Sequence, residues 1–580
     1  MNRVFSFTAS SPEARIELKQ LSGENGIDLY RFTLEYPTPR QPEPIRIDWE
    51  EDMVNILHVW HPTNCGNRFM HQWFAASQNR SFFCEGAPVL CTIGASGSNS
   101  ETISVSDVCT PITISYCIKD LDQQDKVGYA VEFFSRPSDP IQTYTADIRI
   151  DRRSLPFYET IMSVSPWWEE YGHVIPPCPA TAEDPLYSSW YNFHQAPESK
   201  KLLKDLEIAA DLGFRTVILD DGWQFEGPST GNYANCGEWT VAADKFPDFK
   251  AFTDSVHKLG MKLMVWFTAP FIGVDSPACA RFAGKYLYYS EPNKCYILDP
   301  RFPEVRSFLV ETYSDFLRKY DIDGFKLDFI DSFQPGDLAS EVCSEMDFPT
   351  VGEAVRKLLD DITATLAGIK SNLLYEYRQY YVGPAINKFG NMLRVCDCAY
   401  ESLFNRVAIV DLRLMNYPIA IHSDMLFWSN KESIPLCAKQ LLNILFAVPQ
   451  ISVILANSTQ AQKDLLKYYI RYWTENREIL LHGAFRPLHP ELNYTSISAE
   501  NDEKEITVLY ADQPYTYHGK ACDLFHNGDL EGLLVENPTN RLVQAKIFDN
   551  MGNLLSTSCI PANTILRLPV PPTGMARISE

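Results

Sequence analysis

Five aspartates stand at the ends of predicted strands in the middle of the chain: Asp220, Asp221, Asp328, Asp397 and Asp424. An aspartate at such a junction commonly caps the helix that follows. Several carboxylates gathered at one edge of a sheet repel one another, however, and are retained mainly where they serve a purpose. The pattern therefore predicts an acidic site at the carboxyl ends of the strands.

The predicted strand GFKLDFI, residues 324–330, places a cation beside one of these carboxylates. Side chains alternate between the two faces of a strand, so Lys326 and Asp328 share one face, while Phe325 and Leu327 share the other. A neighbouring ammonium keeps a carboxylate ionised, as a carboxylate nucleophile must be. We expect Asp328 to be such a nucleophile, and the alternative is a buried structural ion pair.

Asp397 ends the predicted strand LRVCD, two repeats further along the chain, where it and Asp328 can flank one sugar. Retaining glycosidases use two carboxyl groups about 5 to 5.5 Å apart, one to attack and one to protonate the leaving oxygen. Asp397 is the candidate general acid/base. Cys396 and Cys398 form a lone C-x-C beside it, which we interpret as packing and not as a metal site.

Polar and aromatic side chains near the strand ends are candidates for binding a sugar. Adjacent carboxylates, as in LDDGW, suit neighbouring hydroxyls, and arginines bind a hydroxyl or orient a carboxylate. Tryptophan rings stack on sugar faces, with core packing as the alternative for each. The predicted substrate-binding residues are Asp220, Asp221, Lys326, Trp190, Trp223, Trp239, Trp266, Arg378, Arg394 and Asp424.

Eight apolar segments alternate with amphipathic helical segments and would position this site. The candidate strands are SSWYNF, TVILDDGW, KLMVWFTAP, GFKLDFID, NLLYEYR, LRVCD, IAIHSDML and SVILA, which lie between residues 188 and 456. This series predicts a closed (β/α)8 barrel, whose active site lies at the carboxyl ends of the strands. A doubly wound sheet is the alternative, but the turn NFHQAPESK after the first strand lacks the expected glycines.

The helical segments between these strands have recognisable ends. In the segment 199–213 the apolar residues form one stripe, and Gly213 is placed to close the helix. The segment 302–320 has Pro303 in its first turn, where the missing N–H costs nothing. Both segments therefore predict amphipathic helices that cover a barrel.

All-β regions are predicted on both sides of the barrel, because short alternating stretches are separated there by turn residues. The predicted division is an N-terminal β-sandwich at 1–170, a proline-rich linker at 171–185, the barrel at 186–480 and a C-terminal β-sandwich at 481–580. The predicted fold class is thus multidomain α/β, a central (β/α)8 TIM barrel flanked by an N-terminal β-sandwich and a C-terminal all-β domain.

The composition limits the partners and the compartment. A net charge of −23, from 51 Lys and Arg against 74 Asp and Glu, argues against nucleic acid and against a membrane surface. The 15 cysteines include no C-x-x-C pair. No apolar run has the length of a signal peptide or a membrane span. We therefore expect a cytoplasmic protein with reduced thiols.

The sequence resembles the glycoside hydrolase clan of the α-galactosidases and raffinose-type transglycosylases (the melibiase clan), and most closely its family 36. The resemblance covers the barrel and the flanking β-domains. It is carried by SSWY at 188–191, LDDGW at 219–223, GEWTVAADKFPD at 237–248, GMKLMVWF at 260–267, LDPRFPEVR at 298–306, FKLDF at 325–329 and RVCD at 394–397.

The resemblance assigns roles to matching residues. It implies that Asp328 is the nucleophile, that Asp397 is the acid/base and that Lys326 holds ring hydroxyls. It further implies that the LDDGW aspartates bind the 4- and 6-hydroxyls of a terminal galactose and that Trp190 forms a pocket wall. Two segments depart from the family pattern: WFTAPF stands in place of W-F-E-P-E, and YEYRQYY replaces a glycine-rich segment that ends in arginine.

From the residues and the resemblance we expect hydrolysis of terminal α-D-galactosyl units from an oligosaccharide or glycoside, through an ester on Asp328, without cofactor or metal. The alternatives are raffinose-forming transglycosylation and an α-glycosidase for another sugar, such as an α-glucoside or an α-N-acetylgalactosaminide. A non-catalytic carbohydrate-binding protein is a further alternative. So is a metal-dependent lyase or isomerase that uses His422 with Asp424. Whether the chain forms a homo-oligomer is left open.

Overall fold

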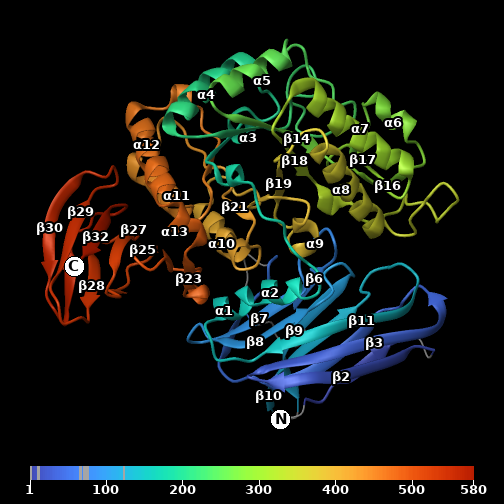
Figure 1. The fold of residues 1–580 in the computed structure, drawn as a ribbon, viewed down its shortest axis with the longest axis horizontal. Coiled ribbons are helices and arrows are strands. Elements are labelled where there is room, and N and C mark those ends of the chain that lie inside the picture. Colours follow the sequence, from blue (N-terminus) through green and yellow to red (C-terminus); the bar gives the residue numbers. More distant parts are fainter. Residues whose placement is uncertain (1–2, 10–12, 64–67, 70–76, 122–123) are drawn as a thin grey trace.

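A computed structural model describes residues 3–9, 13–63, 68–69, 77–121 and 124–580 of the chain. Three groups of elements lie side by side (Figure 1). The N-terminal sheets, in blue, lie below the central barrel, and the C-terminal sheets, in red, lie at its left. Helices surround the barrel and separate it from the C-terminal sheets.

Eight parallel strands form the central sheet. They are β12 (Leu186–Ser188), β13 (Thr216–Leu219), β14 (Lys262–Thr268), β18 (Gly324–Asp328), β19 (Leu374–Arg378), β20 (Met392–Arg394), β21 (Ala420–His422) and β22 (Gln450–Ile451). The pairing runs β21-β20-β19-β18-β14-β13-β12-β22, and parallel bridges from His422 to Val448 and from Leu426 to Ile451 join its two ends. The predicted (β/α)8 barrel is therefore confirmed.

A helix follows each barrel strand before the next one begins. These helices are α4 (Ser199–Leu212), α5 (Phe249–Lys258), α7 (Pro303–Tyr320), α8 (Val351–Ala367), α9 (Pro384–Asn387), α10 (Ser402–Arg413), α11 (Ile434–Asn443) and α12 (Gln460–Glu475). Gly213 ends α4 in the left-handed conformation at φ 108°, and Pro303 occupies the first turn of α7, so both predicted helix ends are confirmed.

Two of the predicted strands are placed wrongly in the chain. The first strand was predicted to include Trp190, but β12 ends at Ser188 and a short helix, α3 (Trp190–Phe193), follows it. The eighth strand was predicted at 452–456, whereas β22 is Gln450–Ile451 and a 3₁₀ turn, η3 (Leu455–Asn457), follows. Strands of two or three residues are too short for their alternation to be recognised in a sequence.

The N-terminal region packs two antiparallel sheets face to face. One sheet contains β1 (Ser6–Ala9), β4 (Ile45–Asp52), β10 (Gln124–Phe133), β9 (Ile112–Leu121) and β6 (Ser77–Ser81). The other contains β2 (Arg15–Glu24), β3 (Ile27–Arg40), β11 (Ile141–Asp151), β8 (Asn99–Val105), β7 (Val89–Gly94) and β5 (Ile56–Trp60). Inward-facing residues of both sheets form a core of their own. Two short helices, α1 (Phe157–Met162) and α2 (Val164–Glu169), follow the last strand.

The C-terminal region contains a larger and a smaller sheet with a separate core. The larger sheet consists of β23 (Ala484–Leu488), β24 (Ser496–Glu500), β25 (Lys504–Leu509), β27 (Ala521–His526), β32 (Met575–Ser579), β29 (Val543–Phe548) and β30 (Leu554–Ile560). The smaller sheet consists of β26 (Tyr515–Thr516), β28 (Leu533–Asn537) and β31 (Thr564–Leu568). Because each all-β region has its own core, we propose the predicted division at 170, 185 and 480 as the domain boundaries.

A three-stranded insertion extends the barrel after β14. Strands β15 (Phe271–Gly273), β17 (Cys295–Leu298) and β16 (Tyr286–Ser290) pair antiparallel, and the short helix α6 (Pro277–Arg281) lies between the first two in sequence. The insertion follows the carboxyl end of β14, so it borders the face on which the acidic site is predicted.

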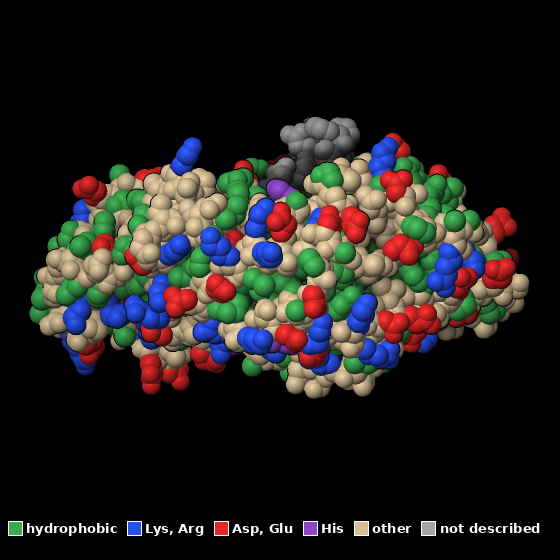
Figure 2. All heavy atoms as spheres, turned by 90° about the horizontal axis from the view of Figure 1, so that it is seen from above, with side chains coloured by type: hydrophobic (Ala, Val, Ile, Leu, Met, Phe, Trp, Pro, Cys, Tyr) green, Lys and Arg blue, Asp and Glu red, His purple; other side chains and the backbone are tan. Residues whose placement is uncertain are grey.

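Two further features concern the surface charges and the apolar length of the helices. In the view from above, acidic and basic side chains are interspersed, without a continuous basic region on that face (Figure 2). Among the described residues, no helix is both long and apolar enough to cross a membrane.

Candidate active site

The interior of the barrel is lined by charged side chains from neighbouring strands. Lys326 lies in register with Trp266 on one side and Glu376 on the other. Its Nζ donates to Oδ2 of Asp220 at 2.7 Å, and both side chains are buried. Burial disfavours the ammonium most strongly, but the charges of Asp220, Asp328 and Glu376 together outweigh it and raise the pKa of Lys326. Lys326 therefore remains a cation at the base of the site.

Asp328, at the end of β18, is held by donors on both oxygens. Oδ1 accepts from Nε of Arg378 at 2.5 Å and from the backbone N–H of Phe329 at 2.9 Å. Oδ2 accepts from Nε1 of Trp266 at 3.0 Å. Burial opposes the charge, but Arg378 and then Lys326 outweigh it and hold the pKa of Asp328 well below its usual range. We expected Lys326 to keep Asp328 ionised, but the cation that contacts Asp328 is Arg378.

Asp397 lies at the open side of this cluster. Its side chain is 55% exposed, and Oδ1 contacts Nη2 of Arg394 at 2.9 Å. Partial desolvation raises the pKa of Asp397, but Arg394 and Lys326 lower it by more, so the carboxyl titrates below its usual range in the free protein. Asp397 is thus accessible and, in the absence of a ligand, ionised at neutral pH.

Arg394 is a buried link between several carboxylates. Besides Asp397, it contacts Oδ1 of Asp424 at 2.5 Å and Oε1 of Glu376 at 3.5 Å. Asp424 is fully buried, and its Oδ2 also accepts from the hydroxyl of Tyr191 at 2.8 Å and from a backbone N–H at 2.7 Å. Asp424 and Arg394 were predicted to bind substrate. Both side chains are enclosed here and contact the loop that carries Asp397, so their binding of substrate stays a prediction.

The two aspartates of LDDGW have different hydrogen-bond partners. Asp220 faces Lys326, whereas both oxygens of Asp221 accept from side-chain amides, those of Gln195 at 2.7 Å and Gln224 at 2.6 Å. Burial and then the charge of Asp220 raise the pKa of Asp221 to about 6, although the two amides lower it. The next residue, Gly222, has φ 106°, and a Cβ there would lie 2.4 Å from the backbone of Gln195. Asp221 therefore fixes the loop, and its role as a direct substrate ligand stays a prediction.

The tryptophans divide into core residues and site residues. Trp223 has no exposed surface, and its Nε1 donates to a backbone carbonyl at 2.9 Å while its ring packs on Phe267 and Phe316. Trp239 is also buried and packs on Phe267 at 5.0 Å. These two rings were predicted to stack on a sugar. The prediction is wrong, because they fill the space between the barrel and its helices.

Two tryptophans remain at the site. Trp266 is buried and acts through its hydrogen bond to Asp328. Trp190 is half-buried on α3 and meets His194 edge-on at 5.3 Å. Of the predicted aromatic walls, only Trp190 presents an accessible ring.

The metal alternative has no support from the geometry of its two residues. Nε2 of His422 lies 2.7 Å from the carbonyl of Ala182, and Nδ1 lies 3.1 Å from Gln450. Burial lowers the pKa of His422 to about 4. Within the described ranges, no group of three or more His, Cys, Asp or Glu side chains could hold a metal ion.

Part of the sequence is similar to a known family and to curated α-galactosidases. Residues 173–348 match the model of the Melibiase family. α-Galactosidase C of Emericella nidulans is 26% identical over 160 residues, which are 25% of this chain and 21% of that protein. The match therefore spans about a fifth of the length of that curated relative.

Solved structures resemble nearly the whole chain. The α-galactosidase of Lactobacillus brevis superimposes with a TM-score of 0.63 at 13% identity, over 100% of this chain and 86% of that one. A variant of the family 36 α-galactosidase AgaA of Geobacillus stearothermophilus, in complex with raffinose, gives 0.62 at 12% identity, over 99% and 87%. The chain is therefore similar in fold to the family 36 α-galactosidases. At these identities, the structural likeness establishes the shared fold of a barrel with flanking β-domains.

Several residues of the candidate site were not predicted from sequence. Tyr191 contacts Asp424, Tyr381 donates to Oδ1 of Asp328 at 3.3 Å, and two glutamines hold Asp221. Tyr191 is the last residue of the motif SSWY and Gln224 directly follows LDDGW, so their position was a usable signal. Tyr381 had no such signal, because its contact depends on how the chain turns after β19.

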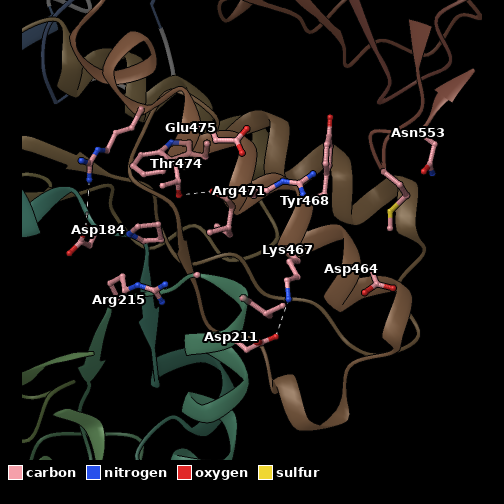
Figure 3. Close-up of a pocket in the computed structure, with 17 residues that line it drawn as sticks. Asp184, Asp211, Arg215, Asp464, Lys467, Tyr468, Arg471, Thr474, Glu475 and Asn553 are labelled. Carbon is pink, nitrogen blue, oxygen red and sulfur yellow. Dashed lines mark hydrogen bonds and ion pairs between the residues drawn. The ribbon is translucent and has the colours of Figure 1, made fainter. Parts of the chain in front are cut away.

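A separate cavity, of about 830 Å³, opens where barrel strands begin (Figure 3). Asp184 and Arg215 line it just before β12 and β13, and Lys467 pairs with Asp211 across it at 3.2 Å. It contains none of the predicted site residues, and it lies at the amino ends of the strands. We therefore place the active site at the other end, around Asp328 and Asp397.

Proposed function

We propose that this α-galactosidase-like protein is a retaining glycoside hydrolase that removes terminal α-D-galactosyl units from oligosaccharides or glycosides. One observation carries the proposal: a buried, ionised Asp328 and an accessible Asp397 lie at the carboxyl ends of barrel strands. The charge of Lys326 lowers the pKa of both, and Arg394 forms an ion pair with Asp397. The α-galactosidases among the relatives, and a structural neighbour solved with raffinose, support galactosides as substrates.

In the first step, an oxygen of Asp328 attacks the anomeric carbon and the glycosidic C–O bond breaks. Oδ2 is the less encumbered oxygen, because it accepts one hydrogen bond whereas Oδ1 accepts three. The proton of Asp397 passes to the leaving oxygen, and a galactosyl ester forms on Asp328.

In the second step, the carboxylate of Asp397 takes a proton from water, and the water oxygen attacks the anomeric carbon. The ester bond breaks and Asp328 leaves as a carboxylate, which Arg378 stabilises by its charge. Two inversions give net retention of the anomeric configuration.

Asp397 must be protonated when substrate is bound, although Arg394 favours its ionised form in the free protein. A sugar that covers the exposed carboxyl removes water from it and raises its pKa. The charge of Asp328 acts in the same direction. We infer that kcat for substrates with poor leaving groups, which reports the pKa of Asp397 in the substrate complex, is highest on the acidic side of neutrality.

A panel of aryl α-glycosides tests the proposal, with proton NMR to identify the first-formed anomer. We expect the α-galactoside to be cleaved much faster than the α-glucoside and the α-N-acetylgalactosaminide, with α-galactose released first. Release of β-galactose would contradict the retaining mechanism, and faster cleavage of another glycoside would contradict the galactose assignment.

We also propose a cytoplasmic location. It is supported by the cysteines, all of which are free among the described residues, including exposed Cys343 and Cys559.

A further inference from the structure

An aromatic side chain next to the proposed acid/base is largely open to solvent. Tyr400 is 69% exposed and follows Asp397 by three residues, in the loop between β20 and α10. Its backbone has φ 66°, in the left-handed region that few residues other than glycine adopt.

Tyr400 is the outer member of a row of three rings, which we call the aromatic ridge. It meets Phe427 edge-on at 5.4 Å, and Phe427 meets Tyr191 at 6.4 Å. The hydroxyl of Tyr191 donates to buried Asp424 at 2.8 Å. The ridge therefore runs from the buried charge network to the solvent, and its inner end is fixed.

The loop that carries Asp397 and Tyr400 is also fixed. The backbone N–H of Cys398, between them, donates to Oδ2 of Asp424 at 2.7 Å. A general acid protonates the oxygen between the sugar that is attacked and the leaving group, so the leaving group lies on the solvent side of Asp397. Tyr400 is in the same loop and is exposed to solvent.

We propose that the exposed face of Tyr400 is an aglycone subsite, on which the sugar ring of the leaving group stacks. Tyr400 is 69% exposed, so most of its ring surface is open to a ligand. An aromatic face binds the apolar C–H face of a neutral sugar. The subsite rests on the proposed hydrolase function, and it makes oligosaccharides better substrates than galactosides without a sugar as leaving group.

Kinetics with two substrates test the subsite. Raffinose carries a sugar leaving group, whereas α-galactosyl fluoride does not. We expect Tyr400→Ala to lower kcat/KM for raffinose about three- to tenfold, the range of one aromatic contact, and to leave the fluoride within twofold. Tyr400→Phe keeps the ring and should retain activity on both. Tyr417→Ala removes another exposed tyrosine, 63% exposed, beyond the end of α10 and should change neither.

A binding measurement separates this proposal from the proposed function. In an Asp328→Asn background, calorimetric titration should show that Tyr400→Ala weakens the binding of raffinose about three- to tenfold and leaves galactose unchanged. Equal affinities for raffinose with and without the Tyr400 ring, or an equal loss for both sugars, would overturn the subsite alone. Binding of neither sugar would overturn the proposed function and the subsite with it.

Discussion

At the scale of single residues, the strongest effect on Asp328 comes from Arg378. The guanidinium contacts Oδ1, and it also lies over the ring of Phe329 at 4.9 Å from the ring centre, so it is held in place. This arrangement keeps the nucleophile ionised. It also attracts the electrons that Asp328 must donate, so the second, ester-cleaving step gains most from Arg378.

The pH dependence of activity should depend on Arg378. Because its charge holds the pKa of Asp328 below the usual range, Arg378→Gln should raise that pKa. The acidic limb of kcat/KM, where Asp328 becomes protonated and inactive, should then move to higher pH. The measurement is the pH profile of kcat/KM with an activated aryl galactoside, whose leaving group needs no acid.

Arg378→Lys is the matched control for this change, because it keeps the positive charge and loses the planar guanidinium. Its acidic limb should stay close to that of the parent protein. If the profiles of Arg378→Gln and the parent superimposed, Arg378 would not control the ionisation of Asp328.

The sequence predicted the charged centre of the site better than its surroundings. Strand alternation correctly put Lys326 and Asp328 on one face of β18, since that pattern is local. The burial of Trp223 was not predictable in this way, because its ring packs on Phe316 of α7, about ninety residues later in the sequence. The partner of Asp424 was missed for the same reason, since Arg394 belongs to a different strand.

At the scale of elements, helix ends were predictable wherever the ending signal lies within one turn. Gly213 is such a signal, and so is Thr459 before α12. The hydroxyl of Thr459 accepts from the N–H of Gln462 at 3.2 Å, and the side chain of Gln462 accepts from the N–H of Thr459 at 3.1 Å. This reciprocal pair is a capping box.

Loss of this cap should destabilise the protein. Thr459→Ala removes the acceptor of the first turn of α12 and should lower the free energy of unfolding by about 1 kcal/mol. Ser433 precedes α11 but makes no side-chain cap hydrogen bond, so Ser433→Ala is the matched control and should cost little. Urea denaturation measures both, and equal losses would contradict the role of the box.

At the scale of the whole molecule, one carboxylate joins all three regions. Asp411 on α10 is fully buried, and its Oδ1 accepts from Trp60 of the N-terminal region at 2.9 Å and from Tyr494 of the C-terminal region at 2.7 Å. Its Oδ2 pairs with Arg68 at 2.6 Å. Burial raises the pKa of Asp411, although Arg68 and both hydrogen-bond donors lower it.

Asp411→Asn should weaken the association of the three regions. The amide oxygen can still accept from Trp60 and Tyr494, but the amide NH₂ then faces the guanidinium of Arg68. Breaking a buried ion pair in this way costs about 3 kcal/mol. We expect a clearly lower midpoint of thermal unfolding, measured by calorimetry.

The control for this substitution is Asp529→Asn. Asp529, in the C-terminal region, pairs with Lys439 of barrel helix α11 at 2.5 Å, but the Asp529 side chain is 85% exposed. An exposed pair contributes about 0 to 1 kcal/mol, so the midpoint should hardly change. A comparable decrease of the unfolding midpoint in both variants would contradict the role of Asp411 in holding the three regions together.

The central claim is that Asp328 forms the covalent bond to the sugar. The most direct test compares hydrolysis of an aryl α-galactoside by the parent protein and by Asp328→Asn, with galactose binding measured on both by calorimetry. The account predicts that kcat falls at least about a thousandfold, because an amide is no nucleophile, while galactose still binds. Undiminished hydrolysis by Asp328→Asn would contradict it.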